Sequence, residues 1–140
     1  MVLHLGDKMN GHKQIILPPE ARVLAVQIYA RGTLLLTTPA LVALRQSYPR
    51  ARIDLLASSR AAPLLASWEV LDDIIELERY LVNAEDGKVE SGKDSTPPLR
   101  TVLRGRGYDA VIVFAHLFEP ITTFKLRHIV RSTDAKTFSM

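Results

Sequence analysis

The stretch RVLAVQIYARGTLLLTTPALVALRQSY (residues 22–48) decides the fold of this chain. It opens with a short run that is almost entirely apolar, as expected of a parallel strand that is covered on both faces. Gly32 follows, and apolar residues then recur at roughly helical spacing until Pro49 ends the pattern. The stretch therefore predicts a strand, a glycine turn and a helix, an arrangement used by many phosphate and nucleotide sites.

The start of this helix is left open by Pro39, which fits two different positions. If the helix begins with Thr33 as its N-cap and Gly32 as a turn glycine, Pro39 lies inside it, opposes the Leu35 carbonyl and produces a kink. If Thr38 is the N-cap and Pro39 takes the first helical position, residues 33–37 form an irregular connection instead. Both starts agree with the sequence.

Strand and helix patterns alternate along the rest of the chain. Further strands are expected over residues 51–57, 72–78, 108–115 and 135–140, and helices over residues 60–68, 99–107 and 121–130. Residues 83–98 are polar and turn-rich and predict a loop, and residues 1–20 predict a poorly ordered leader. Alternation with right-handed crossovers indicates an α/β domain over residues 21–140, a Rossmann-like open parallel sheet with helices on both faces.

The composition excludes several classes of function. With 140 residues, 47% apolar and 24% charged, the chain fits a single globular domain. The absence of cysteine excludes disulfides, thiol catalysis and cysteine-bound metal, and the four histidines lack ligand spacing, so no metal is expected. No segment resembles a signal peptide or a membrane span, which predicts a cytoplasmic protein.

The net charge of +3 is unevenly distributed, with basic residues concentrated in the last third of the chain. Such a region suits nucleic acid, an anionic lipid or a phosphorylated substrate, or it is simply a solvated face. No aromatic interleaving accompanies the basic residues, so no nucleic-acid partner is expected.

In a doubly wound sheet, ligands lie beyond the carboxyl ends of the strands, and this rule selects residues 29–33, 58–60 and 115–119 as candidate site loops. The first of these is neither a Walker A loop nor a dinucleotide fingerprint.

The residues from 23 to 66 closely resemble the opening of the family 9 glycosyltransferases, the heptosyltransferase group of lipopolysaccharide synthesis. The matching motifs are LTTPAL (36–41), YP (48–49), ARID (51–54), LDDII (71–75) and YDAVIVF (108–114). With these later motifs, the resemblance extends over residues 22–138. It implies the N-terminal, acceptor-binding half of a GT-B glycosyltransferase, in which two Rossmann-like halves face each other across a cleft.

The resemblance also implies the chemistry of inverting sugar transfer without a metal. A carboxylate base takes a proton from the acceptor hydroxyl, and the donor is a nucleotide sugar such as ADP-heptose. The family base is the aspartate directly after the turn glycine, a position that Thr33 occupies here. A threonine hydroxyl is not basic near neutral pH, although it can cap a helix or bond an acceptor. Trp68-Glu69 also replaces a usual Asn-Pro pair, and Trp68 is expected to be a packing residue.

By this resemblance the candidate acceptor-binding residues are Arg31, Gly32, Thr33, Arg60 and His116. The two arginines suit the phosphates of a lipid A-type or other glycan acceptor, and His116 suits a titrating group. For each of them a structural role is the alternative: surface arginine, turn glycine or loop histidine. Glu119 is a weaker candidate of the same kind.

The resemblance leaves open whether the chain is an enzyme, because the family base is missing and residues 21–140 hold no donor-binding domain or nucleotide-sugar site. It implies a truncated or split glycosyltransferase half that is inactive alone, with no cofactor of its own. Its partners would be a donor-domain polypeptide encoded nearby, the acceptor, and the inner membrane through peripheral contact. The second hypothesis is a non-catalytic Rossmann-like binding or interaction module.

Overall fold

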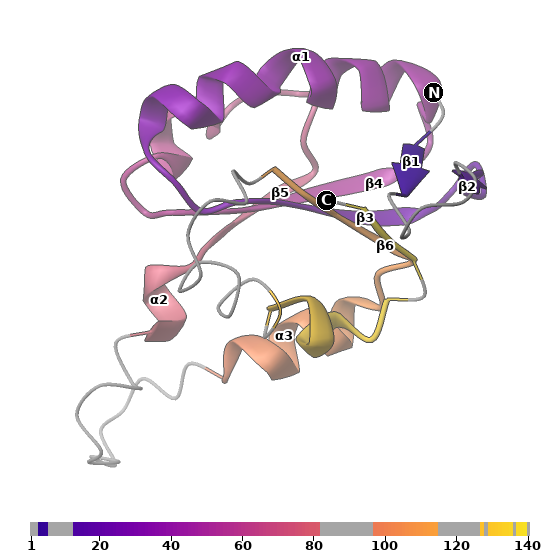
Figure 1. The fold of residues 1–140 in the computed structure, drawn as a ribbon. Helices are drawn as coiled ribbons and strands as arrows, with labels where there is room; N and C mark the ends of the chain where they lie inside the picture. Colours follow the sequence, from indigo (N-terminus) through magenta and orange to yellow (C-terminus); the bar gives the residue numbers. More distant parts are fainter. Residues whose placement is uncertain are drawn as a thin grey trace.

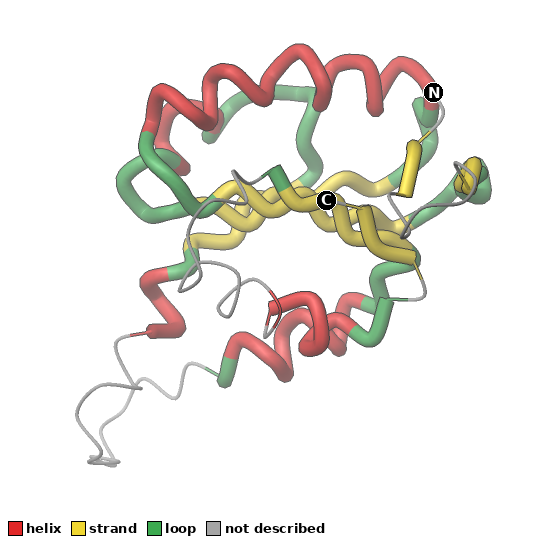
Figure 2. Tube along the Cα trace, in the orientation of Figure 1, coloured by secondary structure: helices red, strands yellow, loops and turns green. Residues whose placement is uncertain are grey.

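A computed structural model of the protein describes residues 3–5, 13–81, 97–114, 127, 129–135 and 137–139. Within them, one parallel sheet lies between two layers of helix, with α1 on one face and α2 and α3 on the other (Figure 1). The same layering is visible in the colouring by secondary structure, where helices flank the strands on both sides (Figure 2). The predicted α/β class and open parallel sheet are confirmed.

The main sheet has five parallel strands in the order β5-β4-β3-β6-β7. Its strands are β3 (Arg22–Gln27), β4 (Arg52–Ala57), β5 (Asp73–Glu76), β6 (Ala110–Val113) and β7 (Thr137–Ser139). The helices are α1 (Arg31–Ser47), the 3-10 turn η1 (Ala62–Leu65), α2 (Glu78–Leu81) and α3 (Leu99–Arg106). All five predicted strands are present, and β5 lies at the sheet edge.

The first twenty residues contain more regular structure than the sequence predicts. Strands β1 (Leu3–Leu5) and β2 (Lys13–Ile15) pair antiparallel as a small separate sheet. Leu17 is 5% exposed and packs in the same core cluster as Leu44 and Ile53. The end of the expected leader therefore belongs to the core, whereas the domain limits themselves stay a prediction. The expected loop over residues 83–98 falls mostly outside the described residues.

Strand β3 is the centre of the sheet and explains why its sequence is apolar at nearly every position. Val23 and Ala25 pack with side chains of α1, whereas Leu24 and Val26 pack with Leu103 of α3 on the other face. All four β3 side chains have no exposed surface. A strand covered on both faces favours apolar side chains, because a buried polar side chain without a partner is costly.

The structure places Pro39 inside the helix, as the first alternative predicts, but the helix begins at neither of the two predicted positions. Helix α1 begins at Arg31 with Ala30 as N-cap, and the Leu34 N–H already donates to the Ala30 carbonyl at 3.1 Å. Thr33 is therefore not an N-cap but the third residue of the helix, and Gly32 is a helical residue with no positive φ. Burial of Leu34 together with Leu41 excludes the start at Thr38, because a helix that began there would leave Leu34 off the inner face.

Pro39 lies inside α1, where it has no N–H to donate to the Leu35 carbonyl. The Thr38 hydroxyl donates to that carbonyl instead, at 2.8 Å. Thr37 makes the equivalent bond to the Leu34 carbonyl at 2.7 Å. In the TTP motif, the threonine before the proline therefore donates to the carbonyl that the proline leaves without a donor.

A double-mutant cycle tests whether the Thr38 hydroxyl compensates for the N–H that Pro39 lacks. Thr38→Val should lower the free energy of unfolding by about 1 kcal/mol, the usual net contribution of one hydrogen bond. In a Pro39→Ala background the same change should cost much less, because the alanine N–H bonds the Leu35 carbonyl itself. Urea denaturation of the four proteins measures the coupling. An equal loss of unfolding free energy in both backgrounds would contradict this compensation.

A buried carboxylate fastens the end of α3 to the sheet. Asp54 of β4 has no exposed surface and accepts from Arg106 Nη1 at 2.8 Å and from the Tyr108 hydroxyl at 2.7 Å. Arg52 Nε lies 3.1 Å away, and Arg106 Nη1 also reaches Asp73 at 2.6 Å. Burial and the bond to Asp54 raise the pKa of Tyr108. Every charge in the cluster has a partner, which is the condition for a buried carboxylate to be tolerated.

Arg45, in the last turn of α1, connects the helix to the residues that precede β4 and β5. Its guanidinium donates to the carbonyls of Ala51 (2.6 Å) and Val70 (3.0 Å) and pairs with Asp72 at 2.6 Å. Asp72 also accepts from the Ile53 N–H at 2.7 Å. Partial burial raises the pKa of Asp72, but the bonds from Ile53 and Arg45 more than offset this, so that its pKa lies below the ordinary 3.8.

This depressed pKa predicts an acid-sensitive contribution to stability. A carboxyl with a folded-state pKa below its unfolded value stabilises the fold above the unfolded pKa and loses that effect as pH falls through the folded one. Asp72→Asn should therefore lower the free energy of unfolding at neutral pH by about 1 kcal/mol or less, since the exposed part of the side chain is screened by solvent. Relative to wild type the deficit should shrink below about pH 4, and urea titrations at several pH values measure it. A deficit that is constant with pH would refute this role.

Candidate functional site

The carboxyl edge of the sheet is where the β3–α1, β4–η1 and β5–α2 connections meet. The Ser58 hydroxyl donates to the Tyr29 carbonyl at 3.3 Å, which ties the first connection to the second. The Ser59 N–H donates to Glu78 Oε2 at 2.6 Å, which ties the second to the third. This edge is the candidate site selected by the rule for parallel sheets.

Two of the predicted site residues come together at this edge. Arg31 Nε donates to the Arg60 carbonyl at 2.8 Å, so the first residue of α1 holds the loop after β4. Both residues are exposed. The bond uses only one nitrogen of the Arg31 guanidinium, whose other N–H groups can bond a ligand.

The first turn of α1 gives the edge a second source of positive potential. The N-cap Ala30 makes no side-chain capping bond, and the first turn has no acidic residue. The N–H groups of the first turn have no partners within the helix, and the helix dipole adds partial positive charge there. Gly32 is exposed, and a Cβ built on it meets nothing within 4 Å, so this glycine is not required by crowding.

Thr33 is half-buried in this first turn, at the position where the resemblance expects an aspartate. No described carboxylate replaces it: Glu78 accepts from the Ser59 N–H and belongs to the framework of the edge. His116 and Glu119, the other titratable candidates, lie outside the described residues. The described part of the edge therefore suits an anion or a sugar hydroxyl, but it has no free base.

Two buried polar atoms at the end of β3 were missed by the sequence analysis. Among the described residues, Gln27 Nε2 and the Tyr29 hydroxyl are the buried side-chain atoms without a hydrogen-bond partner. Gln27 is 1% exposed, and its Oε1 accepts from the Tyr29 N–H at 2.9 Å. Unpaired buried groups are few in native proteins and call for an explanation where they occur. The signal for Gln27 was available, since it is the one polar residue in the run VLAVQI (23–28).

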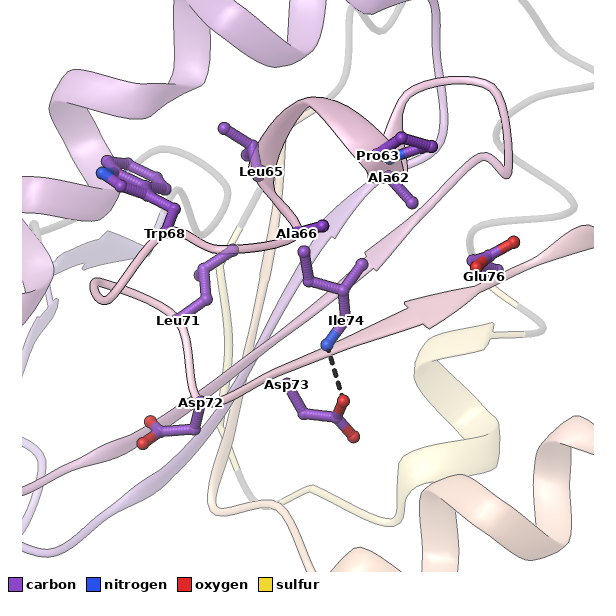
Figure 3. Close-up of a pocket in the computed structure, with 10 residues that line it drawn as sticks. All are labelled: Ala62, Pro63, Leu65, Ala66, Trp68, Leu71, Asp72, Asp73, Ile74 and Glu76. Carbon is purple, nitrogen blue, oxygen red and sulfur yellow. Dashed lines mark hydrogen bonds between the residues drawn. The ribbon is translucent and has the colours of Figure 1, made fainter.

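A separate cavity of about 370 Å³ lies between η1 and the edge strand β5 (Figure 3). It is lined by Ala62, Pro63, Leu65, Ala66, Trp68, Leu71, Asp72, Asp73, Ile74 and Glu76. Ile74 points toward η1, and its N–H donates to Asp73 Oδ1 at 2.8 Å. Trp68 packs against the core cluster on this face, as predicted for a packing residue. Asp72 and Asp73 are both ion-paired, so the cavity has no unengaged aspartate.

Among the described residues, no group of three or more His, Cys, Asp or Glu side chains lies together in a way that would hold a metal ion. In the same residues, none of the helices has the length and hydropathy needed to cross a bilayer.

Comparison with known proteins gives a likeness of fold. No family model and no curated protein matches the sequence. Among solved structures, the family 9 glycosyl transferase from Veillonella parvula DSM 2008 superposes with a TM-score of 0.65 at 19% identity, covering 89% of this chain and 32% of that one. E. coli heptosyltransferase WaaC with ADP gives 0.60 at 22% identity, covering 85% and 34%. The same enzyme with ADP-2-deoxy-2-fluoro heptose gives 0.54 at 20% identity, covering 85% and 36%.

The chain therefore spans about a third of the length of the structures it resembles. At these identities the likeness establishes the fold alone, an α/β arrangement that the chain shares with about a third of each of those longer proteins. The activity, substrates and partners of the longer proteins do not transfer with it.

Proposed function

We propose that these residues form the acceptor-binding half of a heptosyltransferase-like, inverting glycosyltransferase of lipopolysaccharide or other cell-envelope glycan synthesis. The observation that carries the proposal is the β3–α1 connection. It brings Arg31, Arg60 and the first turn of α1 to the carboxyl edge of the sheet, within a fold shared with family 9 structures.

The residues behind the sequence resemblance support the proposal because each has a defined place in the scaffold. Thr38 repairs the helix at Pro39, Asp54 anchors Arg106 and Tyr108, and Asp109 accepts from the Arg22 N–H at 2.9 Å. These contacts hold α1 and β6 in place within the domain whose carboxyl edge carries the candidate site. A retained scaffold with an altered turn suits a protein that still binds an acceptor.

The proposed role in the reaction is binding and orientation. Arg31 and Arg60 would hold acceptor phosphates through charge-assisted bonds, and the Thr33 hydroxyl would bond an acceptor oxygen. The proton of the attacking hydroxyl has no acceptor at Thr33, so sugar transfer requires a carboxylate from elsewhere. The nucleotide-sugar donor, such as ADP-heptose, would be held by a separate donor-binding half, in this chain's case a polypeptide encoded nearby.

The threonine at position 33, in place of a carboxylate base, also favours one alternative function, a non-catalytic binding module. A site with two arginines and a helix N-terminus but no base retains affinity for an anionic ligand without turning it over. The two functions differ in whether a donor-binding half restores transfer. His116 is proposed as an acceptor contact in either case.

A transfer assay tests the catalytic part. The 140-residue chain should transfer no sugar from an ADP-heptose-type donor to a lipid A-type acceptor, and Thr33→Asp alone should not change this. With a donor-binding polypeptide supplied by co-expression, Thr33→Asp should raise turnover by at least about a hundredfold over Thr33→Asn, the matched variant that cannot act as a base. Turnover by the lone wild-type chain would contradict the proposal.

Acceptor binding is tested separately by calorimetry with a soluble phosphorylated acceptor fragment. Arg31→Gln and Arg60→Gln should each weaken binding about tenfold, since each removes a charge-assisted bond. Arg50→Gln is the matched control, because Arg50 is an exposed arginine at the opposite end of α1, paired loosely with Glu20 at 3.7 Å. An equal loss in all three variants would mean that net charge alone, and no site at the carboxyl edge, attracts the ligand.

A further inference from the structure

The loop that follows β4 is held from two sides by charged side chains. Arg31 Nε donates to the Arg60 carbonyl at 2.8 Å, and the Ser59 N–H donates to Glu78 Oε2 at 2.6 Å. These two backbone groups are the N–H that opens the Ser59–Arg60 pair and the carbonyl that closes it. Hydrogen bonds to charged groups are stronger than those between neutral groups. The backbone that carries the Arg60 side chain is therefore fixed at both ends, by residues of α1 and α2.

Glu78 takes the place of a missing bond in the ladder between β4 and β5. The Leu77 N–H donates to the Ala57 carbonyl at 2.9 Å. If this parallel ladder continued, its next bond would run from the Ser59 N–H to the Leu77 carbonyl. That carbonyl instead accepts from the Tyr80 N–H at 3.0 Å, where α2 begins. The Glu78 carboxylate therefore supplies Ser59 with the acceptor that the ladder would otherwise provide.

The position of Glu78 is itself set by the core. Leu77, directly before it, is buried in the core cluster that includes Leu103 of α3. A further bond ties the loop after β4 to the β3–α1 connection, from the Ser58 hydroxyl to the Tyr29 carbonyl, but at 3.3 Å this bond is long and correspondingly weak. The two charged side chains are therefore the main anchors of the loop.

Charge alone gives no reason for a carboxylate at this place. Arg31 is exposed at the same edge, and the first turn of α1 adds partial positive charge there, so that the edge attracts anions. A carboxylate at this edge opposes the attraction, because like charges repel. Removal of the Glu78 charge should strengthen anion binding if net charge decides the affinity. It should weaken anion binding if Glu78 holds the loop in place.

We propose that Glu78 is a positioning residue of the candidate site. Its carboxylate fixes the Ser59–Arg60 backbone, and this sets the direction in which the Arg60 side chain leaves the edge toward the ligand. Glu78 acts through Arg60 and does not contact the ligand itself. The inference rests on the proposed function, since the ligand is taken to be the phosphorylated acceptor.

Calorimetry with a soluble phosphorylated acceptor fragment tests this role through the affinity. Glu78→Ala should weaken binding about tenfold, the order of effect set by one hydrogen bond to a charged group. Glu78→Asp keeps the charge but is one methylene shorter, and it should weaken binding similarly. Glu78→Gln loses the charge but keeps an oxygen that can accept from the Ser59 N–H, so its affinity should stay within about twofold of wild type. Glu76→Ala is the matched control, because it removes the same charge two residues away at the end of β5 and should not weaken binding.

A double-mutant cycle tests whether Glu78 acts through Arg60. In an Arg60→Gln background, Glu78→Ala should cost almost no further affinity, because the side chain that it positions has lost its charge. Hydrogen exchange of the ligand-free protein tests the bond itself. The Ser59 amide should exchange faster in Glu78→Ala and Glu78→Asp than in wild type and Glu78→Gln.

The positioning role is overturned, and the proposed function is not, if the wild type binds the fragment and Glu78→Ala binds it equally or more tightly. An affinity loss in Glu78→Gln as large as that in Glu78→Ala also overturns it, as does a full loss from Glu78→Ala in the Arg60→Gln background. If Glu78→Ala does not fold, the comparison of Glu78→Gln with Glu78→Asp decides in its place. A wild-type chain that binds no fragment would overturn the proposed function, and this role of Glu78 with it.

Discussion

The packing of α1 across β3 and its neighbours is the constraint on which the rest of the structure depends. Leu34, Leu41 and Leu44 have almost no exposed surface, and they meet side chains from β3 and β4 directly beneath them. Because α1 follows β3 after three residues, this packing leaves little freedom in where the helix begins. Its first turn has to lie at the carboxyl edge, with Arg31 beside the loop after β4. The candidate site is thus a consequence of core packing.

Maintaining that helix position needs support at both ends and in the middle. Arg45 fixes the last turn to the residue just before β4, and Thr38 satisfies the carbonyl opposite Pro39. On the other face, Asp54 links Arg106 and Tyr108 to the sheet, which holds β6 in register with β3. These residues carry much of the sequence resemblance to family 9 glycosyltransferases. Their roles here are structural, so the resemblance reports the scaffold more strongly than it reports the chemistry.

The sequence predicts the strands and the alternation well because those signals are local. The run RVLAVQ and the helical spacing of Leu34, Leu41 and Leu44 each lie within a few residues of one another. The helix start was not predictable in the same way, because both positions of Pro39 were acceptable until burial of Leu34 decided between them. The contact of Asp54 with Tyr108 joins residues 54 positions apart, and no local pattern indicates it.

For the site, the bond from the Arg31 side chain to the Arg60 carbonyl lies at the edge that the rule for parallel sheets selects, while the predicted capping role of Thr33 was wrong. The central claim is that the carboxyl edge binds the acceptor. The most direct measurement is an NMR titration of the protein with a soluble phosphorylated acceptor fragment, following the backbone amides. Shifts at Arg31, Gly32, Thr33 and Arg60 are the predicted result. Shifts confined to the cavity beside Trp68 and Ile74 would contradict the account.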